Sequence, residues 1–204
     1  ASALGVSAAA ASTMFATAAQ AMTPKKGGDL KIGSTGGEST NSLDPATYAS
    51  QVPYHNGRQF GDTLVEVSQT GEIEPRLATS VESTPDAKTW MFKLRQGVEF
   101  HNGKTMTGDD VLKTMERHSN ENSKSGALGV MRNIESMKVE GDTFSVTLKD
   151  ANADLPYLMS DYHLIIQPNG GMDNPAEGVG NGPYKMEVDE PGVRHMYTKH
   201  ANYW

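Results

Sequence analysis

The chain has 204 residues, no cysteine and a net charge of −7 at pH 7. This length predicts one or two domains with a sizeable buried core. The acidic balance argues against a nucleic acid or an anionic membrane as partner, because binding phosphate groups requires clustered Lys and Arg. The lack of cysteine excludes disulfides, thiolate nucleophiles and cysteine-based zinc sites, and it is compatible with any redox compartment.

Residues 1–21 have the features of the end of an export signal. They contain no charged residue, are rich in Ala, Ser and Thr, and close with Ala19-Gln20-Ala21, which has small residues at both ends as a signal-peptidase site requires. The segment is only weakly apolar and is followed by Lys25-Lys26, so a permanent membrane span is not expected. Because no basic segment precedes it, we interpret it as a residual export signal. An Ala-rich helix or a disordered arm is the alternative.

Short elements are predicted for the first third of the chain. Alternating apolar and polar residues over 29–33 predict a first strand, and the Gly, Ser and Thr residues of 34–40 predict a loop after it. Asp44 before Pro45 disfavours a helix and predicts a turn. The segments that follow are predicted as a loop over 48–54, a short helix over 58–65 and a hairpin of 64–67 with 71–73.

The central pattern of the sequence spans residues 89–111. Trp90, Phe92 and Leu94 alternate with other residues, which predicts a half-buried strand. Asn102-Gly103 predicts a tight turn, because its backbone tolerates positive φ. Thr107 is then a predicted helix N-cap that forms a box-like start with Asp110, so a helix is expected over 108–117.

The second half of the chain combines strands with loops. An antiparallel pair is predicted over 134–139 and 143–148, joined by a turn at Gly141. Helical spacing of Leu155 and Leu158 predicts a helix over 153–162. The later segments are predicted as a buried strand over 164–166 that pairs with the first strand, a loop over 168–180, and a hairpin of 182–188 with 193–198.

Residues 89–111 also resemble the signature region of a known family. The pattern Trp-x-Phe-x-Leu-Arg-x-Gly-Val-x-Phe-His-Asn-Gly-Lys-x-x-Thr-x-Asp-Asp-Val is similar to that of the extracytoplasmic solute-binding proteins of peptide and nickel type, the family 5 receptors of ABC importers. Further segments fall in the family's order: Leu43-Asp44-Pro45, Pro75 with Leu77-Ala78, Gly180-Asn181-Gly182-Pro183-Tyr184 and Asn202-Tyr203-Trp204. Asn181 departs from the usual Thr, which puts in doubt a hydroxyl acting on ligand there. The chain is also much shorter than family members.

The resemblance implies an α/β fold. The chain would be an incomplete N-terminal lobe, residues 22–204, of a type II periplasmic-binding-protein-like fold. Residues 27–44 and 164–204 would form part of its core α/β subdomain, and residues 45–163 an inserted antiparallel β-rich subdomain. Because full members close two lobes on a ligand, one lobe is expected to have little or no affinity.

The resemblance also implies where a ligand would lie. It would face the loop after the first strand, the segment Gln51-Val52-Pro53-Tyr54 and the turn that holds Asn181 and Tyr184. Val52 and Pro53 would offer backbone groups to an extended peptide, and Tyr54 would stack or donate a hydrogen bond, or else only pack on the loop.

The function implied by the resemblance is the substrate-binding component of an ABC importer. Such a protein captures a peptide or similar small solute in the periplasm or another extracytoplasmic space and delivers it to a membrane permease. No enzyme activity, metal or cofactor is expected. The histidines agree with this expectation, because their positions lack metal-ligand spacing.

Two alternatives stay open beside this reading. The first is an exported hydrolase that uses Asp109, His101 or His163, although helix capping explains Asp109 and its neighbour Asp110 without chemistry. The second is a fragment that self-associates through exposed sheet edges and apolar surface. A phosphate-binding loop around Gly180 is not expected, because no long helix follows it.

Overall fold

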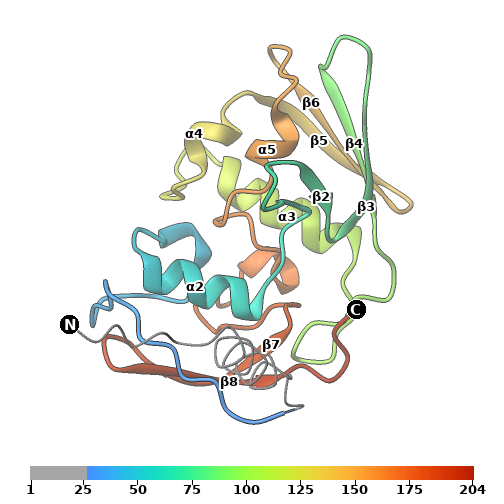
Figure 1. The fold of residues 1–204 in the computed structure, drawn as a ribbon. Helices are drawn as coiled ribbons and strands as arrows, with labels where there is room; N and C mark the ends of the chain where they lie inside the picture. The colour runs from blue at the N-terminus through green and yellow to red at the C-terminus, as the bar shows by residue number, and fades with distance from the viewer. Residues whose placement is uncertain (1–26) are drawn as a thin grey trace, which may run out of the picture. The chain divides into compact units, whose positions relative to one another are not determined.

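The computed structural model of the protein describes residues 27–204 (Figure 1). The predicted export signal at residues 1–21 lies outside the described residues. Residues 27–33 belong to a different unit of the chain from residues 34–204, and each unit is described by itself. Within the described part of the chain, every helix is too short or too polar to cross a membrane.

Residues 27–33 contain no strand, so the predicted first strand over 29–33 is wrong. Leu30 and Ile32, the apolar residues of its alternation, are 84% and 75% exposed. No strand ladder of the described residues includes this segment. Alternation alone does not make a strand, because the backbone groups of a strand need a hydrogen-bonded neighbour.

The largest sheet among the described residues is an antiparallel sheet of four strands. Its order is β3 (Ala78–Ser83), β4 (Thr89–Leu94), β6 (Thr143–Leu148) and β5 (Ile134–Glu140). Phe92 of β4 lies opposite Phe144 of β6, and both side chains are fully buried, with ring centroids 6.2 Å apart. Burial of each ring stabilises the fold by roughly 1.5–3 kcal/mol. The predicted strand around Phe92 and the predicted antiparallel pair are confirmed.

Helix α3 (Gly108–Ser119) packs against this sheet. Thr107 and Asp110 form the predicted capping box, in which the Asp110 carboxylate accepts the Thr107 backbone N–H at 2.8 Å. Val111 and Met115, which lie one turn apart, are fully buried in the same apolar cluster as Phe92 and Phe144. The predicted helix is therefore confirmed.

Helix α2 (Gln51–Phe60) begins and ends earlier than predicted. The predicted loop over 48–54 holds only for residues 48–50, and the predicted helix over 58–65 holds only for residues 58–60. The helix starts after Ser50 and ends before Gly61, and both of these residues have extended backbone.

The sequence of α2 contains two residues that usually interrupt helices. Pro53 lies in the first turn, where a proline loses no intrahelical hydrogen bond. Gly57 lies in the middle, where a Cβ would come within 2.6 Å of the Tyr48 ring. The close approach of Tyr48 therefore explains a glycine that reads as a helix breaker in the sequence.

Residues 153–166 differ from prediction in two ways. The helix is only α5 (Leu155–Leu158), because the Ser160 hydroxyl donates to the Tyr157 carbonyl at 2.6 Å and competes with continued helix. Residues 164–166 are buried as predicted, but they join no strand ladder. Ile166 instead donates its backbone N–H to the Asp62 carbonyl at 3.0 Å, which satisfies a buried donor.

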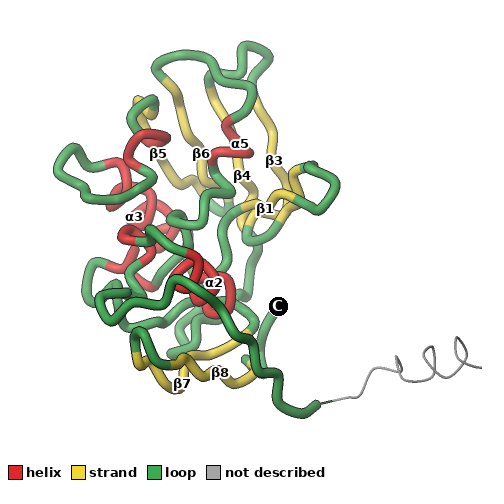
Figure 2. Tube along the Cα trace, turned by 60° about the vertical axis from the view of Figure 1, so that its left-hand side comes forward, coloured by secondary structure: helices red, strands yellow, loops and turns green. Residues whose placement is uncertain are grey.

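Two hairpins complete the larger unit and confirm the predicted ones. They are β1 (Val65–Val67) with β2 (Ile73–Pro75), and β7 (Tyr184–Glu190) with β8 (Arg194–Lys199). The second hairpin lies along α2 (Figures 1 and 2), where the Tyr197 hydroxyl donates to Asn56 Oδ1 at 2.6 Å. Met186 packs against a small buried cluster made of Leu43, Tyr48, Phe60 and Ile165.

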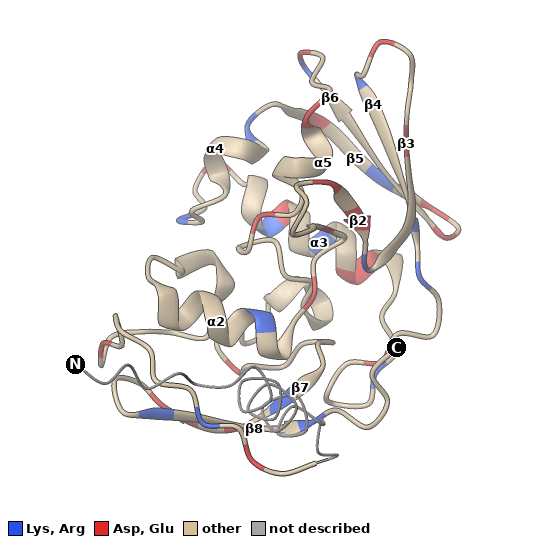
Figure 3. Ribbon diagram, viewed as in Figure 1, with Lys and Arg blue, Asp and Glu red and all other residues tan. Residues whose placement is uncertain are grey.

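The remaining short helices are η1 (Pro45–Thr47), α4 (Leu128–Met131) and η2 (Pro168–Gly171). Acidic and basic segments lie intermingled on α3 and on the β7–β8 hairpin (Figure 3). The division into a core and an inserted subdomain at residues 45 and 163 stays a prediction.

Candidate ligand-binding site

The loop over 34–40 meets the start of α2, as expected for two segments of one site. The Ser50 hydroxyl donates to the Gly36 carbonyl at 3.2 Å. Because this hydroxyl points to the loop, it does not cap the helix. Within the described residues the backbone N–H groups of Gln51 and Val52 therefore have no acceptor. Two donors at the positive end of a helix are thus left for a ligand oxygen.

Tyr54 lies in a line of aromatic rings on the side of α2. Its ring meets Tyr162 edge-on at 5.1 Å, and Tyr162 stacks on Tyr48 at 6.5 Å. The Arg58 guanidinium lies 5.6 Å from the centre of the Tyr54 ring. This packing agrees with the simpler of the two roles considered for Tyr54. The contacts of Tyr162 and Arg58 with the Tyr54 ring were not predicted, because nothing in the sequence links these residues to Tyr54.

His163 connects these aromatic rings to the backbone of Tyr48, which precedes α2. Its Nδ1 lies 2.6 Å from the Asp161 carboxylate and its Nε2 lies 2.9 Å from the Tyr48 carbonyl. Both partners can only accept, so both nitrogens donate when the ring is charged. Burial disfavours that charge, but the hydrogen bond that His163 donates to Asp161 outweighs burial with the help of the bond to the Tyr48 carbonyl, and the pKa of His163 is raised.

The turn with Asn181 packs against the other end of α2. A Cβ on Gly180 would collide with the Phe60 carbonyl, and one on Gly182 would lie 2.5 Å from the Gly61 nitrogen. Gly182 also donates its N–H to the Phe60 carbonyl at 2.9 Å. The two glycines are therefore required for close backbone approach.

The Asn181 side chain is fully buried and faces the protein. Its Oδ1 accepts the Asp62 backbone N–H at 3.0 Å, and its Nδ2 lies 3.6 Å from the Met106 sulfur. Asn181 as a whole is 0% exposed, so neither its side chain nor its backbone faces solvent. Tyr184, in contrast, is 42% exposed at the start of β7.

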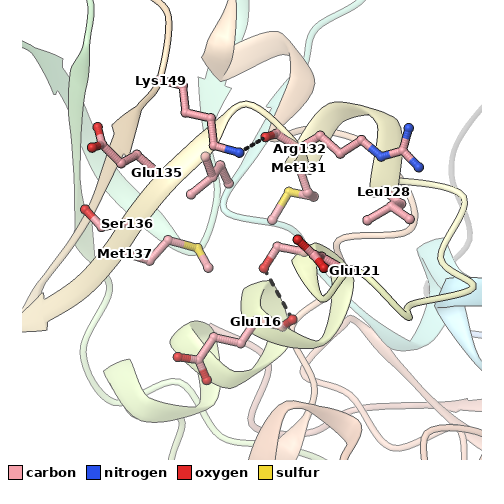
Figure 4. A pocket seen from close by; sticks show the side chains of 11 residues that line it. Glu116, Glu121, Leu128, Met131, Arg132, Glu135, Ser136, Met137 and Lys149 are labelled. Atoms are coloured by element: carbon pink, nitrogen blue, oxygen red, sulfur yellow. Dashed lines mark hydrogen bonds between the residues drawn. The ribbon is translucent and has the colours of Figure 1, made fainter.

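The six predicted residues do not converge on one pocket. Gln51 to Tyr54 lie at one end of α2 and the turn with Asn181 and Tyr184 lies at the other, and a helix of 10 residues is about 15 Å long. A hollow of about 710 Å³ lies elsewhere, between α3, α4 and β5 (Figure 4). None of the six residues lines it.

The chain end is fixed beside the turn. The Tyr203 hydroxyl donates to the Asp62 carboxylate at 3.2 Å and accepts from Arg76 at 2.8 Å. Two guanidinium groups lie against the Trp204 ring, with that of Arg76 5.1 Å and that of Arg95 4.1 Å from the ring centre. These contacts give Tyr203 and Trp204 of the Asn-Tyr-Trp segment a structural role.

The residues considered for a hydrolase serve separate local contacts. Asp109 pairs with Lys113 at 2.7 Å on α3, His163 pairs with Asp161, and His101 faces the Gly182 carbonyl. Among the described residues, no group of three or more His, Asp or Glu side chains is placed to hold a metal ion.

Comparisons with known proteins place the chain in a family. The family described as bacterial extracellular solute-binding proteins, family 5 Middle, matches residues 72–204. The uncharacterized protein YhjP of Bacillus subtilis (strain 168) is 32% identical over 160 residues, which cover 76% of this chain and 27% of YhjP.

Two solved structures are also similar. The PBP AgaA from A. tumefaciens R10, in complex with agropinic acid, has a TM-score of 0.76 and 28% identity, with 82% of this chain and 35% of that chain covered. The ABC transporter-associated periplasmic binding protein DppA from Helicobacter pylori, in complex with the peptide STSA, has a TM-score of 0.72 and 28% identity, with 82% and 38% covered.

The chain thus spans between 27% and 38% of the length of these relatives. Its mixed helices and antiparallel sheets match part of a type II periplasmic-binding-protein fold, which confirms the predicted fold class. The match over residues 72–204 covers most of the chain, including the signature stretch and the Gly-Asn-Gly-Pro-Tyr turn. The chain therefore belongs to the bacterial extracellular solute-binding proteins of family 5.

Proposed function

We propose that the chain forms a ligand-facing part of an extracytoplasmic receptor that captures a peptide or similar small solute and delivers it to an ABC permease. Family membership supports a binding role. The H. pylori relative in complex with the peptide STSA supports a peptide as the class of solute. In this role the chain binds and releases its ligand and makes or breaks no covalent bond.

Two backbone N–H groups at the start of α2, which have no acceptor among the described residues, carry this proposal. Gln51 and Val52 present adjacent donors next to the loop that bonds Ser50. An extended peptide offers carbonyl and carboxylate oxygens as acceptors, and the positive end of the helix favours them. Pro53 adds no donor, so its contribution is to fix the first turn.

Tyr184 extends the proposed ligand face at the far end of α2. Its exposed ring would pack on a ligand side chain, while Asn181 would act by holding the turn in place. A ligand that contacts both ends of α2 would have to span about 15 Å, which an extended peptide of about five residues can do.

The proposal is tested by titrating the isotope-labelled chain with a mixture of di- to pentapeptides and following its amide NMR signals. We expect weak binding, in the range of about millimolar dissociation constants, because this face alone surrounds only one side of a ligand. The signals of Gly36, Val52, Tyr54 and Tyr184 should shift.

Two substitutions at one position separate backbone from side chain. Val52→Pro removes the N–H at a position in the first helical turn that tolerates proline, whereas Val52→Ala keeps the N–H. Peptide-induced shifts should be lost in the first variant and retained in the second. Equal shifts in both variants, or shifts confined to other parts of the chain, would contradict the proposal. Submicromolar affinity would contradict the expected weak binding of this chain by itself.

A further inference from the structure

Two histidines hold the turn of residues 180–184 by its carbonyl groups. His101 donates its backbone N–H to the Gly180 carbonyl at 2.8 Å, and its ring Nε2 lies 3.0 Å from the Gly182 carbonyl. His200 donates its backbone N–H to the Pro183 carbonyl at 2.8 Å. Three carbonyls of one short turn are thus bound by two residues that lie far apart in the sequence.

The contact with the Gly182 carbonyl fixes the tautomer of the neutral His101 ring. A carbonyl only accepts, so Nε2 carries the proton in the neutral ring and Nδ1 is bare. Nδ1 is buried and has no partner among the described residues. A second proton on Nδ1 would therefore be a buried donor without an acceptor, which is costly.

The neighbours of the His101 ring also oppose a positive charge. The His200 ring meets it edge-on at 4.9 Å, and its own Nε2 is buried without a described partner. Burial lowers the pKa of His101, and the charges of His200 and Lys185 lower it further against the opposing effect of the Gly182 carbonyl. The carboxylate of Glu99, on the same stretch as His101, is bound by the Asn202 amide at 3.0 Å.

We propose that the neutral His101 ring, packed against His200, is the positioning group that holds the 180–184 turn in its ligand-facing form, and that protonation of His101 in mild acid releases the turn. The effect of this release on ligand binding rests on the proposed function. The release itself is a structural change of the free chain and requires no ligand.

Hydrogen exchange of the free chain, followed by NMR, tests the inference. The amides of His101 and His200 donate to carbonyls of the turn, the amide of Gly182 donates to the Phe60 carbonyl of α2, and all three report whether the turn is held in place. After correction for the intrinsic pH dependence of exchange, their protection should fall about tenfold or more from about pH 7.5 to about pH 5. The amides of the four-stranded sheet should keep their protection.

Variants of His101 separate titration from packing. His101→Gln keeps an N–H donor near the position of Nε2 and does not titrate, so protection of the turn should persist at about pH 5. His101→Leu removes the donor, so protection should be low at both pH values. His55→Gln removes an exposed histidine of α2 and serves as the matched control, which should behave as the unmodified chain.

A loss of protection in acid that is equal in His101→Gln and the unmodified chain would overturn the inference, as would unchanged protection in the unmodified chain. If the Gln variant does not fold, the imidazole nitrogen NMR signals of the unmodified chain provide a second test. They should report the Nε2–H tautomer at neutral pH, and the Nδ1–H tautomer would overturn the inference. Because no ligand is present, failure of the peptide titration would leave these outcomes unaffected.

Discussion

Acid should weaken the fold through His118, a fully buried histidine on the inner side of α3. Its Nδ1 lies 2.5 Å from the Ser125 hydroxyl, and its Nε2 is buried without a partner among the described residues. Burial lowers the pKa of His118 to about 4, and the nearby Arg117 charge acts in the same direction. Protonation would leave a buried charge and an N–H without an acceptor.

The size and sign of the effect follow from linkage. The ordinary pKa is 6.5 and the folded value is about 4. At a pH between these two pKa values, His118 is protonated in the unfolded chain and neutral in the folded chain. The contribution of neutral His118 to the free energy of unfolding is therefore complete above pH 6.5 and is lost as the pH falls towards 4. At about pH 5 the loss should be about 2 kcal/mol, and it should approach about 3 kcal/mol at lower pH.

Urea unfolding of the chain and of His118→Asn at about pH 8 and about pH 5 measures this loss. The variant is less stable at the higher pH because of its smaller side chain, but the difference between the two proteins should shrink by about 2 kcal/mol at the lower pH. Titration of His163, whose pKa is raised, cancels because it is common to both proteins. His55→Asn, at an exposed position, should leave the pH dependence unchanged. An identical pH dependence in His118→Asn and the unmodified chain would refute the reasoning.

Three further substitutions test individual contacts by their effect on the free energy of unfolding in urea. Gly61→Ala places a Cβ against the Ile165 side chain and should cost about 1–3 kcal/mol. In the double variant with Ile165→Ala the two costs should not add as they would for unrelated core sites, because the side chain that the new Cβ meets is gone. Arg117→Met leaves the Asp44 carboxylate, now bound at 2.6 Å, without its cation and should cost about 3 kcal/mol because both groups are mostly buried. Thr107→Ala removes the helix cap and should cost about 1 kcal/mol. We expect Arg117→Met to cost more than Thr107→Ala because the Arg117 pair is more buried than the helix cap. A larger cost for Thr107→Ala would contradict this expectation.

Local patterns explain which elements the sequence predicted. The strand around Phe92 and the helix capped by Thr107 and Asp110 depend on neighbours within a few residues, and both are confirmed. The start of α2 was missed because Gly57 reads as a breaker, and the contact with Tyr48 that accounts for it depends on the tertiary fold. The predicted strand over 29–33 failed because pairing partners are not visible in an alternating pattern.

The predicted site residues stay a prediction, but the structure shows which of their segments lie together. The loop after residue 33 and the Gln51 segment lie together, as the resemblance implies. Burial of the Asn181 side chain depends on Asp62 and Met106, and no spacing in the sequence indicates that these residues meet. The contact of His101 with the Gly182 carbonyl was missed for the same reason.

Helix α2 joins the two halves of the proposed ligand face as a stiff rod. Its first turn carries the free donors, and its last carbonyl, that of Phe60, is bonded to Gly182 in the distant turn. A hydrogen-bonded helix of 10 residues resists compression, so a push on one end is transmitted to the other. The helix therefore fixes the separation of the two halves of the proposed ligand face, and only a solute whose own length matches that separation would contact both of them.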